Sequence, residues 1–393
     1  MNTPPSILFV LPWHLSKAVG VNQVVINLAR ETARRGKLRP IIFCADSRCE
    51  TFEETETPEG IKLVTGHLRA PLTSSQTGRN LAVFAHKLRD DMAVWRAFID
   101  KHRVRVINAH YPGLNYAVFA LLRRRLTNFR LLFSLHGADI AGIERSGMAA
   151  KPFARWMLKK ADRIVCCSED LEKRTQESLK LDENCLCTIH NGIDIAELDL
   201  AKKDAYRPNI GSFDNYLVNV AAFEHGKGQD LLLQAYTQLL RDGLKSALVL
   251  IGHKTPHLES LRNGARQLGL QDHVFFISDL DHMKTLSAIR NARLLVQASR
   301  EEAFGLPLLE AGYLGTPVVA TRVGGTSEVL GSYYPYLADA NDPAALAAKI
   351  DEALYNPTET KQQIKLVKRR VATNFTWGRA YSAYTSAWSA GLD

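Results

Sequence analysis

The strongest constraint in this sequence is a repeated alternation of short apolar runs with amphipathic stretches of helical period. In the first half, strand-length runs such as 7–12 and 104–110 alternate with helical patterns such as 22–35. Strands that are apolar on both faces are typical of parallel sheets covered by helices on both sides. The pattern therefore predicts an α/β fold built from doubly wound, Rossmann-like sheets.

The polar segment 201–215 interrupts this alternation. It contains Pro208 and Gly211 and has no hydrophobic period, which is typical of a linker. A second series of strand-length runs follows it, over 216–223, 247–252, 274–278, 294–298 and 317–321. A chain of 393 residues is long enough for two cores. We therefore predict an N-terminal domain over 1–200, a linker over 201–215, a C-terminal domain over 216–375 and a last helix over 376–393.

Composition excludes several classes of protein. The chain is 46% hydrophobic and 23% charged, which is typical of a globular protein. Its apolar runs are far shorter than the roughly 20 residues of a membrane-spanning helix. No signal-peptide pattern opens the sequence, and we expect a cytoplasmic protein. The six cysteines lack the paired spacing of a metal site and are interpreted as small core residues.

The net charge of +9 is unevenly distributed. Residues 1–190 hold 29 Lys and Arg against 19 Asp and Glu, whereas residues 191–393 hold 21 against 22. The excess, which includes 123–125 and a cluster over 151–163, favours an anionic partner such as a phosphorylated acceptor or the inner face of an anionic membrane. A solvated basic face without a partner remains an alternative. Nucleic acid is disfavoured, because no zinc-finger, RNP or basic-zipper signature accompanies the charge.

The densest chemical signal lies in the segment 299–321. An apolar run precedes it, so residues 300–305 are expected in the loop that follows a strand, and Pro307 suits the first turn of a helix. The backbone N–H groups of Gly305 and Leu306 would then form a phosphate seat at a helix N-terminus. Glu302 and Glu310 could both face one ligand and accept hydrogen bonds from sugar hydroxyls. Taken alone, Glu310 is better explained as an acidic residue favoured near a helix N-terminus.

With these residues, nearly the whole chain resembles the family 4 retaining glycosyltransferases, which have the GT-B fold of two Rossmann-like domains facing across a cleft. The two glutamates, with seven residues between them and Phe304-Gly305-Leu306-Pro307 in that interval, match the family's signature. The resemblance implies that Glu302 contacts the hydroxyls of the donor sugar and Glu310 the ribose. It also implies a donor site that includes Phe304, with Gly305 and Leu306 binding the diphosphate through their N–H groups. The last helix is implied to cross back to the N-terminal domain.

A second block, 220–228, also follows the family. Lys227 and Gly228 match its Lys-Gly pair, and the resemblance implies that Lys227 holds the donor phosphates. The family usually has Gly-Arg where this chain has Ala221-Ala222, so a phosphate-binding arginine is missing. His225 is one candidate to replace it.

In the N-terminal half, His136 follows a predicted strand at a turn. A single histidine is often a packed or surface residue, but the family match implies a contact with the donor sugar or the transferred group. Gly20 matches the family's glycine-rich loop before the first helix, where it would let a phosphate or acceptor approach the backbone. His110 also matches a family position.

We expect no metal and no resident cofactor. Asp279-Leu280-Asp281 has the form of a metal-nucleotide motif, but its place between a strand and a helix favours a turn or cap. The donor would be a UDP- or GDP-linked sugar bound as substrate, and the acceptor a glycan or lipid-linked glycan in cell-surface polysaccharide or lipopolysaccharide synthesis. The resemblance implies transfer with retention by front-face attack, with His136 and Glu302 as the catalytic residues. The alternatives are a sugar-nucleotide epimerase or phosphorylase of the same fold, and a non-catalytic nucleotide-sugar binding protein.

Overall fold

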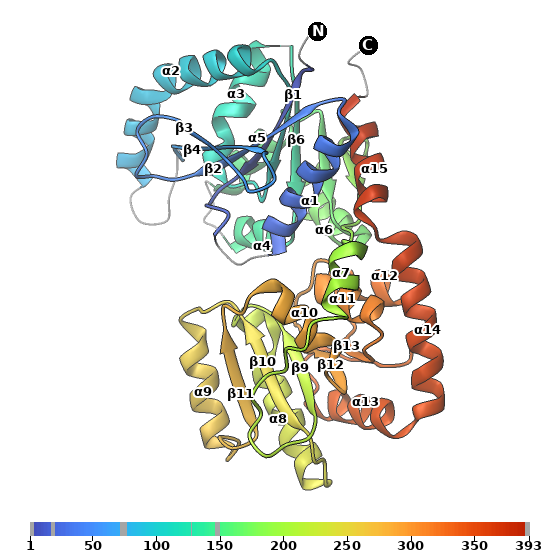
Figure 1. Cartoon of the computed structure of the whole chain (residues 1–393). Helices are drawn as coiled ribbons and strands as arrows, with labels where there is room; N and C mark the ends of the chain where they lie inside the picture. Colours follow the sequence, from blue (N-terminus) through green and yellow to red (C-terminus); the bar gives the residue numbers. More distant parts are fainter. Residues whose placement is uncertain (1–3, 17–19, 71–76, 127, 146–149, 390–393) are drawn as a thin grey trace. The chain divides into compact units, whose positions relative to one another are not determined.

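The chain forms two compact units, each built around its own sheet (Figure 1). The computed structural model describes residues 4–16, 20–70, 77–126, 128–145 and 150–389. The first unit comprises Met1–His190 together with Trp377–Asp393, and the second comprises Asn191–Thr376. The predicted α/β class with two doubly wound sheets is confirmed.

The first unit contains an eight-stranded sheet in the order β3-β4-β2-β1-β5-β6-β7-β8. All neighbouring strands are parallel except β3, which runs antiparallel to β4. The strands are β1 (Ser6–Leu11), β2 (Arg39–Ala45), β3 (Glu53–Glu56), β4 (Lys62–Gly66), β5 (Val104–His110), β6 (Arg130–Leu135), β7 (Arg163–Cys166) and β8 (Leu186–Thr188). The helices are α1 (Gly20–Arg35), α2 (Thr77–His102), α3 (Ala117–Arg125), α4 (Ala138–Arg145), α5 (Ala150–Leu158), α6 (Glu169–Leu179) and α15 (Trp377–Ser389).

The second unit contains a six-stranded parallel sheet in the order β11-β10-β9-β12-β13-β14. Its strands are β9 (Tyr216–Val220), β10 (Ala247–Gly252), β11 (Val274–Ser278), β12 (Leu294–Gln297), β13 (Val318–Thr321) and β14 (Leu337–Ala338). Its helices are α7 (Ile195–Ala201), α8 (Gln229–Arg241), α9 (His257–Gln267), α10 (His282–Arg290), α11 (Leu306–Leu314), α12 (Thr326–Leu330), α13 (Pro343–Tyr355) and α14 (Pro357–Asn374).

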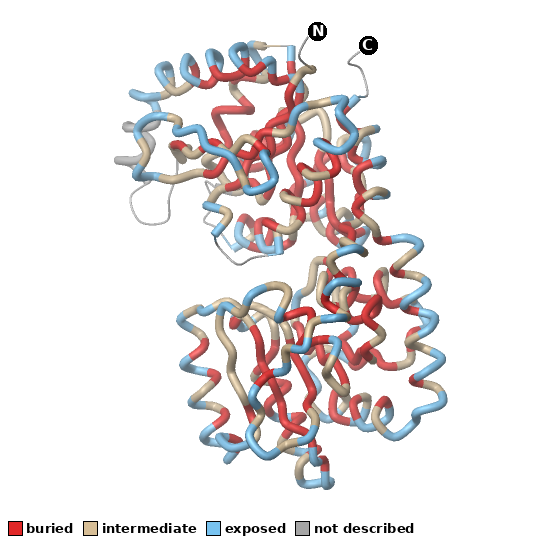
Figure 2. The backbone as a smooth tube through the Cα atoms, in the orientation of Figure 1, coloured by how far each residue is buried: buried red, intermediate tan, exposed pale blue. Residues whose placement is uncertain are grey.

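Burial explains why the strands read as continuous apolar runs. Every residue of β1 is buried, as are all but the last residues of β9 and β10. Figure 2 shows that burial is concentrated in the strands, whereas the covering helices turn exposed faces outward. Within the described ranges, no helix combines the length and the apolar character that crossing a bilayer would require.

The helix α15 packs into the core of the first unit. Its aromatic side chains Tyr384 and Trp388 are buried among strand residues that include Phe9. The Trp388 Nε1–H donates to Asn108 Oδ1 at 3.2 Å, and the Tyr384 hydroxyl lies 3.1 Å from Ser134 Oγ. These bonds satisfy polar side chains within the buried sheet, where an unpaired group would be costly.

The segment 201–215 belongs wholly to the second unit, and the chain passes between the units at His190–Asn191 and at Thr376–Trp377. This polar segment belongs to the second unit because two of its residues, Phe213 and Tyr206, contact that unit through a ring and through a backbone carbonyl. The Phe213 ring packs edge-on against that of Phe275, and Asn291 Nδ2 donates to the Tyr206 carbonyl. The two crossing points meet in the second unit, where Ile193 N donates to Phe375 O.

Candidate functional site

Two loops at the carboxyl ends of β9 and β12 are joined by several hydrogen bonds in the second unit. The backbone N–H groups of Arg300 and Glu301 donate to Gly226 O at 2.8 and 3.1 Å. Gly228 lies so close to the second loop that a Cβ on it would be 1.9 Å from Ala298 O. Its φ of +63° is also in the left-handed region. Only glycine fits at this crossing, which places Lys227 beside the loop that carries Glu302.

Glu302 is held by three donors that converge on one carboxylate oxygen. Lys227 Nζ lies 3.0 Å from Glu302 Oε2. The side chains of Gln297 and Ser299 donate to the same oxygen, each at 3.1 Å. Lys227 keeps 25% of its side chain exposed and Glu302 keeps 10%. The arrangement fixes the rotamer of Glu302 and leaves Oε1 without a partner among the described residues.

The helix α11 begins directly after this loop. Gly305 is its N-cap residue with φ +92°, and no side chain caps the helix. Pro307 lies in the first turn, as predicted. Phe304 is buried, and its ring packs edge-on against that of Phe375. The side chain of Phe304 thus belongs to the core, whereas the backbone at Gly305 and Leu306 forms an uncapped helix start suited to an anion.

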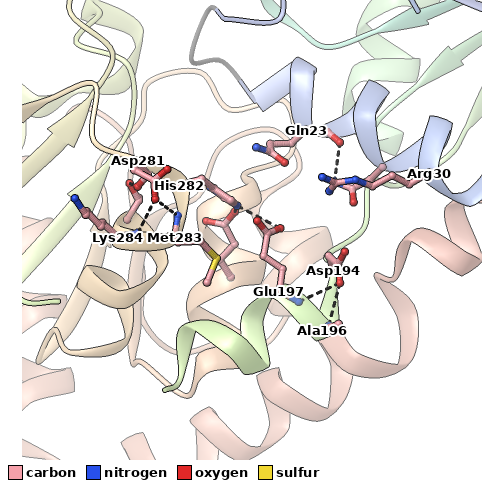
Figure 3. A network of polar contacts seen from close by, with 12 residues as sticks. Gln23, Arg30, Asp194, Ala196, Glu197, Asp281, His282, Met283 and Lys284 are labelled. Carbon is pink, nitrogen blue, oxygen red and sulfur yellow. Dashed lines mark hydrogen bonds and ion pairs between the residues drawn. The ribbon is translucent and has the colours of Figure 1, made fainter. Parts of the chain in front are cut away.

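Glu310, one turn further along α11, lies in a second polar cluster. Burial raises the pKa of its carboxyl group, against the opposing effect of nearby His282. His282 Nε2 lies 4.0 Å from Glu310 Oε1 and 3.8 Å from Glu197 Oε2. Figure 3 shows His282 and Glu197 pointing toward one another from α10 and α7. Sequence reasoning missed Glu197, because α7 was not predicted and lies more than 100 residues before α11. It missed His282, because only the tertiary fold packs α10 against α11.

The Asp279-Leu280-Asp281 segment serves the local fold. Asp281 accepts from the backbone N–H groups of Met283 and Lys284, capping α10 (Figure 3). Asp279 Oδ1 contacts His253 Nδ1 at 2.7 Å. The predicted cap is confirmed for Asp281. Across the described parts of the chain, no three His, Cys, Asp or Glu side chains are grouped so as to hold a metal ion.

Arg300 is a further residue of this site that sequence reasoning missed. Its guanidinium makes two bonds of 2.7 Å to the Asp230 carboxylate and donates to the His225 carbonyl and to Asn341 Oδ1. Arg300 therefore braces the Lys227 loop. The His225 contact uses the backbone, so the structure does not assign the His225 side chain to the place of the missing arginine. The only signal in the sequence was an arginine beside the glutamate signature.

The remaining predicted residues lie in the first unit. Gly20 is exposed and is the first residue of α1. His136 is half-buried and follows β6, before α4. The Asp139 carboxylate accepts from the N–H groups of His136, Gly137 and Ile140, which fixes this turn. Burial raises the pKa of Asp139 to about 6 despite these bonds.

Comparisons with known proteins agree with this geometry. Residues 19–197 match the family described as Glycosyltransferase Family 4, and residues 202–370 match Glycosyl transferases group 1. An uncharacterized glycosyltransferase of Methanocaldococcus jannaschii is 29% identical over 72% of this chain and 75% of its own length. A D-inositol 3-phosphate glycosyltransferase of Corynebacterium diphtheriae is 26% identical over 92% of this chain and 88% of its own. The structure of Anabaena HepE with UDP and glucose superposes with a TM-score of 0.73 at 17% identity, covering 98% of this chain and 99% of that one.

Proposed function

Since the chain belongs to the family 4 glycosyltransferases of GT-B fold, we propose that it transfers a sugar, with retention of configuration, from a nucleoside diphosphate sugar to a phosphorylated or lipid-linked glycan. The observation that carries the proposal is the Lys227–Glu302 pair beside the uncapped start of α11. A lysine and a helix N-terminus are complementary to a diphosphate, and a carboxylate with an open oxygen is complementary to sugar hydroxyls.

In this proposal the second unit binds the donor. Lys227 and the N–H groups of Gly305 and Leu306 neutralise the diphosphate as it leaves, so that departure needs no metal ion. Glu302 is already held through Oε2, and its Oε1 accepts a bond from a sugar hydroxyl without losing rotamer freedom on binding. Glu310 receives the ribose. UDP is the first nucleotide to test, because UDP is bound in the Anabaena HepE structure.

The first unit would supply the acceptor side. Its excess of basic residues suits a phosphorylated acceptor, and the Corynebacterium diphtheriae relative is named for inositol 3-phosphate. Arg123 makes two 2.8 Å bonds to Asp162, so it contributes to the fold and is not an open binding site. We assign the contact with an anionic phosphate or membrane surface to half-buried Lys151, on α5, and to exposed Lys159, directly after α5. If the acceptor is membrane-bound, we expect the wild type to bind anionic vesicles. The Lys151→Ala, Lys159→Ala double variant should bind the same vesicles more weakly.

A thermal-shift screen with UDP-, GDP- and ADP-linked sugars tests the donor site, because a ligand of the native state raises its stability. We expect one nucleotide class to raise the melting temperature of the wild type but not of Lys227→Ala. Lys349→Ala, which removes a half-buried lysine paired with Glu352 in the same unit, is the matched control. An equal shift in Lys227→Ala and the wild type would contradict the site.

Transfer is then measured with the labelled donor that binds and with phosphorylated or lipid-linked acceptors. We expect Glu302→Gln to lower turnover by roughly 100-fold or more, since a preorganised polar contact at the reacting sugar is lost. If the label is recovered in an epimer of the donor and none is transferred to an acceptor, the protein is an epimerase and the proposal is wrong. Donor binding with no turnover of any kind would indicate a nucleotide-sugar binding protein.

A further inference from the structure

Two histidines, one buried and one half-buried, form a close pair at the carboxyl ends of β5 and β6. His110 Nδ1 lies 3.2 Å from His136 Nε2, and the two ring planes are inclined by 24° with centroids 5.4 Å apart. His110 is completely buried. Burial lowers the pKa of both side chains, that of His136 to about 3, so both rings are neutral near pH 7.

The fold holds His110 in place from several sides. The Tyr116 hydroxyl donates to the His110 carbonyl at 3.1 Å. The next residue, Tyr111, has φ +55° and donates its N–H to Ser134 O. The His110 ring also neighbours the rings of Phe9 and Tyr384, with centroids at 6.0 and 6.4 Å. A ring fixed in this way presents Nδ1 to His136 in one orientation.

Two neutral imidazoles can share this contact in only two ways. If His136 donates through Nε2–H, the proton of His110 must lie on its Nε2, which is buried and has no hydrogen-bond partner among the described residues. If His110 donates through Nδ1–H, its Nε2 carries no proton and only a lone pair is left without a hydrogen-bond partner. A buried N–H without an acceptor is rare in native proteins and costs about 1–3 kcal/mol. The second arrangement is therefore favoured.

We infer that His110 is a positioning residue that holds His136 in its Nδ1–H tautomer. The hydrogen bond made by one ring nitrogen selects which nitrogen of a neutral histidine carries the proton. With Nε2 occupied as an acceptor, His136 retains Nδ1–H as its single free polar group and acts as a hydrogen-bond donor.

This inference rests on the proposed function and on the contact with the donor sugar or the transferred group that the family resemblance implies for His136. A neutral donor suits an oxygen of the sugar or of the leaving phosphate, where negative charge develops. The same tautomer prevents His136 from serving as the general base, because the nitrogen able to accept a proton is bonded to His110. The acceptor proton must then pass to another group, such as an oxygen of the leaving phosphate.

The tautomer can be read directly, without any substrate, from long-range ¹H–¹⁵N spectra of the histidine-labelled full chain. His136→Gln identifies the signals of His136 by their disappearance. We expect a protonated Nδ1 and an unprotonated Nε2 in His136 from pH 6 to 8. An Nε2-bound proton on His136 in the wild type would overturn the inference.

Two substitutions of His110 test whether it makes the selection. His110→Leu removes the donor and should let the Nε2–H form of His136 appear, whereas His110→Asn can keep an amide N–H near the position of Nδ1 and should preserve the tautomer. His102→Leu, which removes another buried histidine of the same unit, should leave the signals of His136 unchanged. An unchanged His136 tautomer in folded His110→Leu would refute the role of His110. If that variant does not fold, the wild type and His110→Asn still decide the question.

Turnover provides the functional readout. We expect His110→Leu to lower kcat roughly fivefold to tenfold, as for one lost hydrogen bond, with a smaller effect on KM for the donor and with recovery in His110→Asn. Equal kcat values in the wild type and His110→Leu would contradict the positioning role. Full turnover in His136→Ala would instead remove His136 from the proposed function, and the spectra would still report the tautomer independently.

Discussion

Replacing Gly228 with alanine should disrupt the junction between the Lys227 loop and the Glu302 loop. Two costs add at this position. An L-residue at φ +63° is strained by about 1 kcal/mol. The new Cβ would also lie 1.9 Å from Ala298 O, so the two backbones must separate by more than 1 Å. That movement breaks the bonds from Arg300 N and Glu301 N to Gly226 O, which adds about 2 kcal/mol.

Gly269→Ala is the matched control. Gly269 lies in the same unit at φ +72°, and a Cβ built on it meets no atom within 4 Å. It therefore carries the backbone strain without the close approach. The loss of glycine flexibility in the unfolded chain is the same in both variants and cancels in the comparison. The difference between the two free energies of unfolding, about 2 kcal/mol, isolates the contact with Ala298.

The sequence itself suggests the assay. All five tryptophans, at 13, 95, 156, 377 and 388, belong to the first unit. Tryptophan fluorescence in urea therefore reports the first unit alone and should be unchanged in both variants. Hydrogen exchange of β9, β10 and β12 reports the second unit, where 2 kcal/mol corresponds to about 30-fold less protection for Gly228→Ala than for Gly269→Ala. Equal protection in the two variants would refute the argument that the crossing requires glycine.

Three further predictions concern the loop brace, the buried histidines and the last helix. Arg300→Lys should destabilise the second unit by about 1–2 kcal/mol in the hydrogen exchange of β9, β10 and β12, because lysine cannot reproduce the two-bond contact with Asp230, and it should weaken donor binding in the thermal-shift assay. Arg262→Lys, at an exposed ion pair on α9, should change neither quantity. The pKa of His136 is lowered in the native state, so the unfolded state takes up a proton first as the pH is reduced. The free energy of unfolding of the first unit, followed by tryptophan fluorescence, should therefore fall as the pH drops below 6.5. His136 contributes at most about 1.4 kcal/mol per pH unit to this fall. Asp139 opposes this below about pH 6, where the native state takes up its proton first, so its titration should flatten the loss below that pH. The loss should be absent if the rings are charged in the native state. Trp388→Phe should cost the first unit about 1–3 kcal/mol by leaving Asn108 Oδ1 unpaired, whereas half-buried Trp156→Phe should cost far less in the same urea titration.

Elements with a hydrophobic period were predictable because that period is local. The strands over 104–110 and 274–278 were expected from spacing alone, and the last helix, expected within 376–393, is observed over 377–389. The strand β3 was not, since Glu53–Glu56 is an exposed edge strand with no apolar residue to reveal it. The linker was interpreted from its polar composition, but Phe213 packs against Phe275 of the second unit, so this segment belongs to that unit.

Local patterns along the chain were thus sufficient to predict the α/β fold, and the resemblance to the family pointed to the two loops and the acidic signature. Which side chains meet was decided by the order of strands in each sheet. Lys227 reaches Glu302 across 75 residues because β9 and β12 are neighbours, and His110 reaches His136 because β5 and β6 are. The tautomer of His136 and the brace at Arg300 depend on such long-range neighbours. The local sequence pattern predicts each strand but not the order of the strands, because strand pairing depends on contacts between distant segments that form only in the complete sheet.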